Sequence, residues 1–422
     1  MENSPASEQL GIEWFEPDSP GASDRAGHVQ PAEVHSELAL GSAELTQQLV
    51  TEGRALGFAR VGVTTAEPLF AAQKRLERFR ERGFAGGMSY LVEGDRHDPR
   101  TLLPGVKSIV VGAFPHGDPS LVPLRRGPLA GAVARYAQGE DYHMKLKMRL
   151  QALGRRLATL LGQRLRGRVC VDTAPILERE LAVRSGLGFQ GKSTLVLTPG
   201  VGSYVLLAEL LVEVELAPTT STAGSCGSCR ACLDACPTQA FPEAYVLDAR
   251  RCLSYLTIEF DGVFPRELRR ALGNRVFGCD VCQEVCPYNA SPGRPQTSEL
   301  GARPALRAPD LVGLLNLGSA PYRTLVRRTA LRRVSRTTLQ RNAAIALGNS
   351  DAAEAVAPLT QALRAHSRAL VRAHVAWALG ELCRHWDDAA VSALRHAQGH
   401  DDDPLTRDEA ALALARSTAT AR

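Results

Sequence analysis

Eight of the ten cysteines of this chain lie in one segment, between residues 226 and 286. The segment contains the run Cys-x2-Cys-x2-Cys-x3-Cys-Pro, then an isolated cysteine, then the run Cys-x2-Cys-x3-Cys-Pro. Thiolates at this spacing hold [4Fe–4S] clusters in proteins that carry two of them. Structural zinc also uses Cys-x2-Cys pairs, but it requires neither the further cysteines nor the proline. The pattern therefore predicts two iron–sulfur clusters rather than zinc or disulfides.

The spacing also predicts which cysteines share a cluster, because the fourth cysteine of such a run binds the other cluster. The first cluster is then held by Cys226, Cys229, Cys232 and Cys286. The second cluster is held by Cys236, Cys252, Cys279 and Cys282. Clusters of this type transfer electrons, so we expect a redox protein.

Length and composition indicate a protein of two or three domains without a membrane span. The 422 residues are 44% hydrophobic and 23% charged, as in ordinary soluble proteins. No apolar run is long enough to cross a membrane, and the first residues do not form the basic and apolar regions of a signal peptide. Clustered cysteines in such a chain predict a cytoplasmic location.

Charge is distributed unevenly along the chain. Residues 1–40 contain eight acidic side chains and one basic one, whereas the whole chain has a net charge of +5. Residues 1–41 are also rich in Ser, Pro and Gly, and we predict a disordered acidic extension there. The remaining chain is strongly basic, which is compatible with a polyanionic partner.

Residues 42–220 alternate predicted helices with short strands and should form an α/β sandwich. The expected helices are 43–56, 68–82, 140–162 and 175–186, and the expected strands are 58–64, 107–114, 168–173, 194–198 and 203–216. The cysteine segment, 221–295, follows as a ferredoxin-like domain. Residues 296–422 form a basic linker and an all-α domain, in which NAAIALGN (342–349), HVAWALGE (374–381) and EAALALAR (409–416) resemble one another. This repetition predicts HEAT-like repeats rather than an ordinary helical bundle.

Two motifs in the first domain have competing interpretations. Asp172 lies where a predicted strand ends, a position at which ligands gather and where a half-buried carboxyl group can donate a proton. It also precedes a predicted helix, and spacing alone favours a helix cap. Residues 186–193 match a phosphate-binding loop, but they follow a helix and lead into a strand, which is the reverse of the usual context. We therefore predict no nucleotide binding there.

Residues 311–350 contain no Asp or Glu. They contain seven arginines, which a polyanion would neutralise: Arg323, Arg327, Arg328, Arg332, Arg333, Arg336 and Arg341. Only Tyr322 is aromatic here, so contact with a phosphate backbone is expected rather than base stacking.

The chain from about residue 43 onward resembles the epoxyqueuosine reductases. The resemblance rests on ARYAQGEDYH, VDTAPILERELAVRSGLGFQGKST, the eight-cysteine pattern with RCLSYLTIE and GNRVFGCDVCQEVCP, and the repeat that begins LQRNAAIALG. It implies the reduction of epoxyqueuosine to queuosine at the wobble position of tRNAs with GUN anticodons. It also implies cobalamin as a second cofactor and a cobalamin-binding sandwich domain.

The resemblance assigns roles to particular residues. Asp172 matches the family's proton donor, and Tyr142 lies nearby. Expected corrin contacts are Arg96, Ala134, Asp172, Val196, Leu207, Arg251, Ser254, Asp280 and Val281. Ile258 joins the seven arginines as an expected tRNA contact.

A reductive dehalogenase is one alternative, since it combines two clusters with a corrinoid in a related fold. The absent signal peptide and the seven arginines argue against it. A non-catalytic ferredoxin-type electron-transfer module is another alternative, but it leaves the first domain without a purpose. We expect a monomer that receives electrons from an unidentified low-potential donor such as flavodoxin or ferredoxin.

Overall fold

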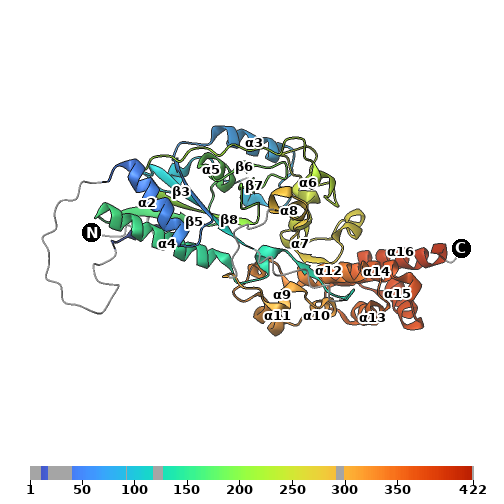
Figure 1. Cartoon of the computed structure of the whole chain (residues 1–422). Helices are drawn as coiled ribbons and strands as arrows, with labels where there is room; N and C mark the ends of the chain where they lie inside the picture. Colours follow the sequence, from blue (N-terminus) through green and yellow to red (C-terminus); the bar gives the residue numbers. More distant parts are fainter. Residues whose placement is uncertain (1–10, 18–39, 92, 117–126, 291–298, 421–422) are drawn as a thin grey trace.

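The computed structural model describes residues 11–17, 40–91, 93–116, 127–290 and 299–420. Strands and helices of the first domain occupy one end of the molecule, and a row of helices occupies the other (Figure 1). The cysteine segment lies between these two parts (Figure 1). The molecule is therefore elongated.

A five-stranded antiparallel sheet forms the centre of the first domain, in the order β1-β5-β8-β3-β2. Its strands are β1 (Ile12–Phe15), β2 (Arg60–Thr65), β3 (Ser108–Pro115), β5 (Leu165–Cys170) and β8 (Val205–Val212). On β3, Val110 packs into one hydrophobic cluster, whereas Ile109 and Val111 pack into another. Because successive residues of a strand point to opposite faces, both faces of the sheet are covered.

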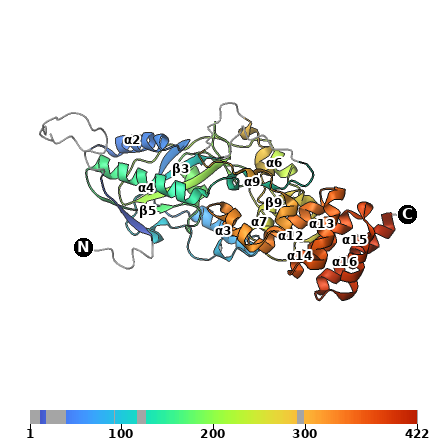
Figure 2. The same ribbon diagram turned by 90° about the horizontal axis from the view of Figure 1, so that it is seen from below.

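Helices cover both faces of the sheet. The cluster on one face contains α2 (Ser42–Ala55) and α4 (Tyr142–Leu161), which lie side by side (Figure 2). The opposite cluster contains α5 (Glu178–Arg184), and α3 (Phe70–Glu81) lies near it (Figure 1). This arrangement confirms the predicted combination of a sheet with packed helices.

The predicted elements of the first domain are found with their ends shifted by at most four residues. The strand expected at 194–198 is shorter than predicted and lies outside the main sheet. It becomes β7 (Val196–Leu197), which pairs with β6 (Phe189–Gln190) in a separate ribbon.

The prediction that all of residues 1–41 are disordered is wrong for residues 12–15. They form β1, an edge strand paired with β5. Phe15 is buried, and its ring lies against Gly154 of α4, where a Cβ atom would come within 2.8 Å of it. A four-residue strand is too short to give a periodic signal in the sequence. Residues 1–10 and 18–39 of the extension lie outside the described residues.

The cysteine segment folds into short elements between loops. They are α6 (Ala231–Asp234), α7 (Leu253–Ile258), β9 (Arg275–Phe277) and α8 (Val281–Glu284). β9 pairs in parallel with β4 (Ala132–Val133), a strand of the first domain. This pairing attaches the cysteine segment to the domain that contains Asp172.

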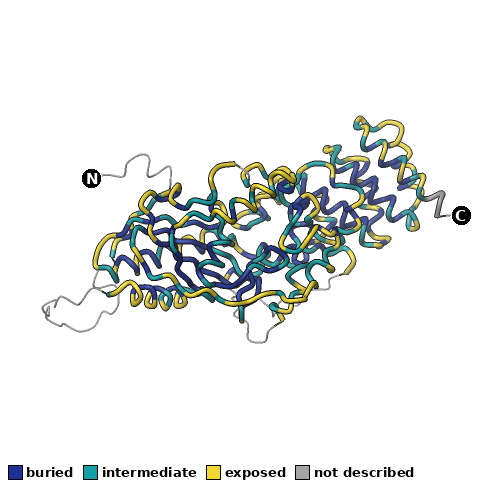
Figure 3. The backbone as a smooth tube through the Cα atoms, turned by 90° about the horizontal axis from the view of Figure 1, so that it is seen from above, coloured by how far each residue is buried: buried dark blue, intermediate teal, exposed yellow. Residues whose placement is uncertain are grey.

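The C-terminal region consists of helices. They are α9 (Pro304–Arg307), α10 (Leu311–Leu315), α11 (Ser319–Val326), α12 (Arg336–Gly348), α13 (Val356–Ala365), α14 (Ala369–Glu381), α15 (Asp388–His400) and α16 (Pro404–Thr420). The backbone is buried along the inner side of this stack (Figure 3). Within the described part of the chain, no helix combines the length and the apolar character needed to cross a membrane.

The three similar sequence segments lie on α12, α14 and α16. A glycine allows each of these helices to pack closely against the next. A Cβ atom at Gly348 would lie 2.7 Å from the Cα of Ala378 on the next repeat. A Cβ atom at Gly380 would lie 2.9 Å from the Cβ of Ala413 on the third repeat. The repeated Ala-Leu-Gly motif therefore reflects helix packing.

Arg341, which the sequence predicted as a tRNA contact, is instead buried inside the protein. Its guanidinium donates to the backbone carbonyls of Leu256, Phe260 and Gly262 at 2.6 to 2.8 Å. It has no exposed surface with which to reach a phosphate. Sequence alone cannot distinguish this bridge to the cysteine segment from an exposed arginine, since both are basic residues on a helix.

The glycine packing gives a first prediction. We expect Gly348→Val to lower the urea midpoint of anaerobic protein, because the added methyls displace α14 and such overpacking costs about 1–3 kcal/mol. Gly399→Ala is the matched control, since no atom lies near its Cβ position on α15. That control should be as stable as wild type or more stable. A Gly348→Val protein that unfolds at the wild-type midpoint would contradict the packing.

Candidate active site

Asp172 lies in the turn between β5 and α5, in the left-handed backbone region with φ of +57°. Aspartate adopts this conformation more readily than most residues. Its backbone N–H donates to Oε1 of Glu178, the first residue of α5, at 2.7 Å. Because α5 begins at Glu178 and its N-cap is Leu177, Asp172 does not cap the helix. The side chain is therefore available for other contacts.

Two consecutive side chains at the start of α4 converge on the Asp172 carboxylate. Tyr142 donates from Oη to Oδ2 of Asp172 at 3.1 Å, and Nε2 of His143 lies 3.2 Å from the same oxygen. Asp141 caps α4 by accepting the His143 N–H, and its carboxylate lies 2.6 Å from Nδ1 of that imidazole. His143 thus lies between two carboxylates, a role that its sequence position did not indicate.

These contacts place a proton on the imidazole rather than on Asp172. Burial opposes a positive charge on His143, but its hydrogen bonds to Asp141 and Asp172 outweigh this effect and raise its pKa to about 9. The hydrogen bond to His143 lowers the pKa of Asp172, although burial acts in the opposite direction. Near neutral pH the site contains an imidazolium beside a carboxylate.

A second pair of carboxyl groups lies behind the Asp172 turn. Glu209 on β8 is fully buried, and its carboxyl group interacts with that of Glu178. Its neighbour is Glu178, which accepts the Asp172 N–H. Burial raises the pKa of Glu178 to about 7 and that of Glu209 well above its usual range. Two buried carboxylates this close cannot both ionise cheaply, so the pair retains a proton.

The cysteine thiols lie in two groups. Besides burial, the neighbouring thiols of Cys226, Cys286 and Cys229 raise the pKa of Cys232. In the other group, burial is the main cause that raises the pKa values of Cys252, Cys279 and Cys282, and neighbouring thiols raise them further. For Cys252 the neighbouring thiol is that of Cys236. None of the ten cysteines forms a disulfide within the described part of the chain. No three His, Cys, Asp or Glu side chains in the described ranges are arranged around a single metal ion.

The segment that resembles a phosphate-binding loop contacts the first group of cysteines. Lys192 donates from its backbone N–H to Sγ of Cys226 at 3.4 Å. Its ammonium donates to the carbonyls of Gly227 and Cys229 at 2.7 and 2.9 Å. Sequence reasoning missed this role, since a Gly-Lys pair carries no signal for contact with a distant loop.

The expected corrin contacts fall into separate places. Ala134 and Asp280 lie together, because the Ala134 N–H donates to Phe277 and the next N–H donates to Oδ2 of Asp280 at 2.7 Å. Val281 follows as the first residue of α8. Val196 and Leu207 pack in or against the hydrophobic cluster under α5.

The remaining expected corrin contacts are Arg96, Arg251 and Ser254. Arg96 donates to the carbonyl of Tyr90 at 2.6 Å. Arg251 donates to the carbonyl of Thr238 at 2.9 Å. Ser254 is a partly buried residue of α7.

Five of the seven predicted tRNA-binding arginines are exposed: Arg323, Arg327, Arg328, Arg332 and Arg333. Arg336 is partly buried, and Arg341 is the buried exception described above. Arg333 is paired with Glu259 at 2.5 Å, so its charge is partly neutralised. Ile258 is partly buried and packs against the helical core. Together these exposed arginines form a basic surface, and one of them, Arg333, lies close enough to Asp172 to lower the pKa of its carboxyl group.

The carboxyl pair gives a second prediction. Because burial raises both pKa values, the folded protein binds more protons than the unfolded chain above about pH 4.5, so its stability falls as pH rises. We expect Glu209→Gln to reduce this dependence of stability on pH. In urea unfolding at pH 8, its free energy of unfolding should exceed that of wild type by on the order of 1–3 kcal/mol. The difference should vanish near pH 4.5.

The matched control is Glu215→Gln, which removes an exposed carboxylate just after β8. It should retain the wild-type pH slope. A Glu209→Gln protein that is less stable than wild type at pH 8 would show that the carboxylate has a partner that compensates its charge.

Three family models match the chain. They are a 4Fe-4S double cluster binding domain over residues 225–289, epoxyqueuosine reductase QueG, DUF1730 over residues 96–173, and HEAT repeats over residues 325–415. The first and third confirm the predicted pair of [4Fe–4S] clusters and the predicted repeats. The second contains Tyr142, His143 and Asp172.

Curated relatives and solved structures agree with these matches. An epoxyqueuosine reductase of Alicycliphilus denitrificans is 39% identical over 81% of this chain and 99% of its own length. That of Pseudomonas aeruginosa is 40% identical over 80% of this chain and 94% of its own length. Two crystal structures of epoxyqueuosine reductase, one with an epoxyqueuosine-modified tRNA-Tyr stem loop, superpose with a TM-score of 0.81 at 30% identity, covering 89% and 90% of this chain and all of theirs. The similarity extends through all three segments, and the chain belongs to the epoxyqueuosine reductase family.

Proposed function

We propose that this protein reduces epoxyqueuosine to queuosine at the wobble position of tRNA. Its relatives are named for this reduction, and one solved relative holds a modified tRNA stem loop. The observation on this chain that carries the proposal is the convergence of Tyr142 and His143 on Asp172, beside the cysteine segment. Removal of the epoxide oxygen as water requires two electrons and two protons. The structure offers separate groups for each.

The eight thiols of the cysteine segment fit two [4Fe–4S] clusters, which would supply the electrons. Cys226, Cys229, Cys232 and Cys286 would hold the first cluster, and Cys236, Cys252, Cys279 and Cys282 the second. Cys229 is exposed, so a flavodoxin or ferredoxin could deliver electrons at the first set. Tyr136 is near both Asp172 and Asp280, and Asp280 lies between Cys279 and Cys282 of the second set in the sequence. The protein would act as a monomer.

An aromatic row supports a flat cofactor between Asp172 and the second set of cysteines. The ring of Tyr136 contacts those of Tyr142 and Phe277, with centroids 6.2 Å apart in each pair. Phe277 precedes Gly278, where a Cβ atom would lie 2.5 Å from that of Ala134. Cobalamin is the cofactor that the family resemblance implies, and when bound it would supply the electron pair that opens the C–O bond. Its contacts would be Arg96, Ala134, Asp172, Val196, Leu207, Arg251, Ser254, Asp280 and Val281.

The protein's own residues would supply a proton to the epoxide oxygen. The imidazolium of His143 holds the proton at Nε2, directed at Oδ2 of Asp172. Asp172 would pass this proton to the substrate oxygen as the C–O bond breaks, and His143 would then return to the neutral form. Tyr142 fixes the position of Oδ2 through its hydroxyl. Asp172 is then the proton donor, and His143 is the group that recharges it.

The basic surface beside this site would bind the tRNA backbone. Its exposed arginines lie on α11 and in the stretch between α11 and α12, and the Arg328 carbonyl accepts the Asp141 N–H at 2.9 Å. This hydrogen bond joins the surface to the start of α4. Ile258 and Arg336 would extend the contact. A phosphate backbone bound here would place an unpaired anticodon nucleotide near Asp172.

The test of the proposal is the conversion of epoxyqueuosine-containing tRNA by anaerobic protein loaded with iron, sulfide and cobalamin. Queuosine should appear in the nucleosides of the digested tRNA when a low-potential reductant is added. No queuosine after many hours, with both clusters reduced, would overturn the proposed function.

A third prediction concerns Asp172→Asn. The variant should hold the same iron and cobalt as wild type but form queuosine about 100-fold more slowly or worse, because an amide cannot relay the proton. Asp402→Asn makes the same change at an exposed position of the repeat domain and should react at the wild-type rate. Wild-type turnover by Asp172→Asn would remove this carboxyl from the reaction.

A fourth prediction concerns pH. The charged groups nearest His143 are Asp141 and Asp172, with Arg332 near the first and Arg333 near the second. Since the raised pKa of His143 is about 9, single-turnover rates should stay level from neutral pH to about 9 and fall above it. Asp141→Asn removes the hydrogen bond that raises this pKa, so the fall should begin at lower pH. An alkaline limb at the same pH in both proteins would exclude His143 as its source.

A further inference from the structure

The turn between β6 and β7 contains the Gly-Lys pair of the segment that resembles a phosphate-binding loop. Lys192, in this turn, is partly buried. Its N–H donates to Sγ of Cys226 at 3.4 Å, and its ammonium donates to the carbonyls of Gly227 and Cys229 at 2.7 and 2.9 Å. One residue therefore contacts the first set of cysteines through both its backbone and its side chain.

Surrounding contacts fix the position of this turn. The Thr194 N–H donates to the carbonyl of Gly191 at 2.9 Å, and the Lys192 carbonyl accepts the Tyr245 N–H at 3.0 Å. Arg179 of α5 donates to the carbonyl and to the hydroxyl of Thr194, at 2.8 and 3.1 Å. The turn is thus held by its own backbone, by α5 and by Tyr245, which gives Lys192 a defined place beside the first set.

The Lys192 ammonium brings a positive charge to the loop that contains Cys226 and Cys229. Both of its hydrogen-bond partners are neutral carbonyls, which hold the charge without cancelling it. A cluster becomes more negative when it accepts an electron, so a fixed positive charge nearby favours the reduced form. Hydrogen bonds to the ligand sulfurs also set the potential of a cluster, and the Lys192 N–H makes one to Cys226.

The second set of cysteines provides a comparison within the same chain. Its member Cys236 accepts a hydrogen bond at Sγ from the Ala240 N–H at 3.3 Å. The hydrogen bonds of Lys192 to the cysteine segment are instead made to Cys226, Gly227 and Cys229. A change at Lys192 should therefore act on one cluster much more than on the other.

We propose that Lys192 is a positioning residue that raises the reduction potential of the cluster held by the first set. A flavodoxin or ferredoxin gives up one electron, and this cluster accepts it. The raised potential makes the exposed loop around Cys229 the favoured point of entry for electrons. Only this direction of electron flow rests on the proposed function.

The test is a redox titration of anaerobic full-length protein loaded with iron, sulfide and cobalamin, followed by electron paramagnetic resonance of the reduced clusters. Lys192→Gln removes the charge but keeps an amide that can donate to a carbonyl. The variant should hold about eight irons per chain, as wild type does. At the wild-type midpoint, the ratio of reduced to oxidised first cluster should fall about fivefold, which is a shift of about 40 mV to lower potential. The other midpoint should not move.

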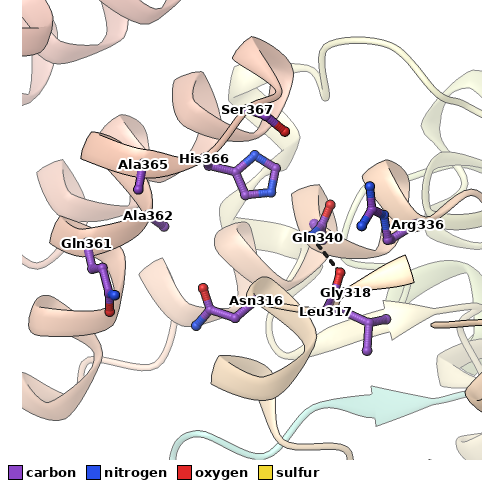
Figure 4. Close-up of a pocket in the computed structure, with 10 residues that line it drawn as sticks. All are labelled: Asn316, Leu317, Gly318, Arg336, Gln340, Gln361, Ala362, Ala365, His366 and Ser367. Carbon is purple, nitrogen blue, oxygen red and sulfur yellow. Dashed lines mark hydrogen bonds between the residues drawn. The ribbon is translucent and has the colours of Figure 1, made fainter. Parts of the chain in front are cut away.

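Two further variants separate a local charge from other effects. Lys192→Arg keeps the positive charge and should retain the wild-type potential. Combining Lys192→Gln with Gln361→Lys restores the net charge in the repeat domain instead, because Gln361 of α13 lines a hollow of about 270 Å³ there (Figure 4). This double variant should keep the lowered potential of Lys192→Gln.

Three results would overturn the inference. One is the same pair of midpoint potentials in Lys192→Gln and wild type, and another is a parallel shift of both potentials. The third is a Lys192→Gln protein with only about four irons, because the lysine would then be needed to build the first cluster rather than to set its potential. The titration requires no tRNA, so its outcome does not depend on whether the protein reduces epoxyqueuosine.

Discussion

Two hydrogen bonds to one oxygen of Asp172 connect elements that the sequence keeps apart. Their donors, Tyr142 and His143, begin α4 on one face of the sheet, whereas Asp172 leads into α5 on the other. The geometry of the site therefore depends on how both helices pack on the same strands. Glu178 stabilises the turn by accepting a hydrogen bond from the Asp172 N–H. A displacement of about 1 Å at such a site is enough to lower a rate substantially.

Buried polar contacts between the segments keep this site in register with the rest of the chain. Arg341 of α12 donates to three carbonyls of the cysteine segment, and Asn342 donates to the carbonyls of Thr257 and Val276. Removing one partner of a buried charged group leaves the other unsatisfied, at a cost of several kcal/mol. The cysteine segment and the first repeat consequently share one hydrophobic core. Electron supply, proton supply and RNA binding are thus built on one framework.

Local patterns in the sequence predicted much of this structure. Cysteine spacing predicted two iron–sulfur clusters, in agreement with the matched double-cluster model, and the Ala-Leu-Gly motif predicted the repeats because close helix packing requires a glycine at Gly348 and Gly380. The main helices and strands of the first domain could be predicted from the periodic spacing of hydrophobic residues. These features depend on residues that are near in sequence or that recur at a fixed interval.

Other features could not be predicted, because they arise from contacts between distant residues. Phe15 lies in a four-residue edge strand that exists only by pairing with β5. In the sequence Arg341 cannot be distinguished from the exposed arginines near it. Only the folded structure shows that its guanidinium is surrounded by backbone carbonyls. The pKa of His143 depends on Asp172, which is 29 residues away in the sequence. The Glu178–Glu209 pair likewise forms only when α5 packs on β8.

We infer that near neutral pH Asp172 is ionised and His143 holds the proton. The most direct test is carbon NMR of protein labelled at its aspartate carboxyl carbons, with the Asp172 signal assigned by its loss in Asp172→Asn. We expect this carboxyl to titrate below the usual range for aspartate and to be fully ionised at pH 7. A carboxyl that is still protonated at pH 7 would contradict it and would make Asp172 the resident proton donor without help from His143.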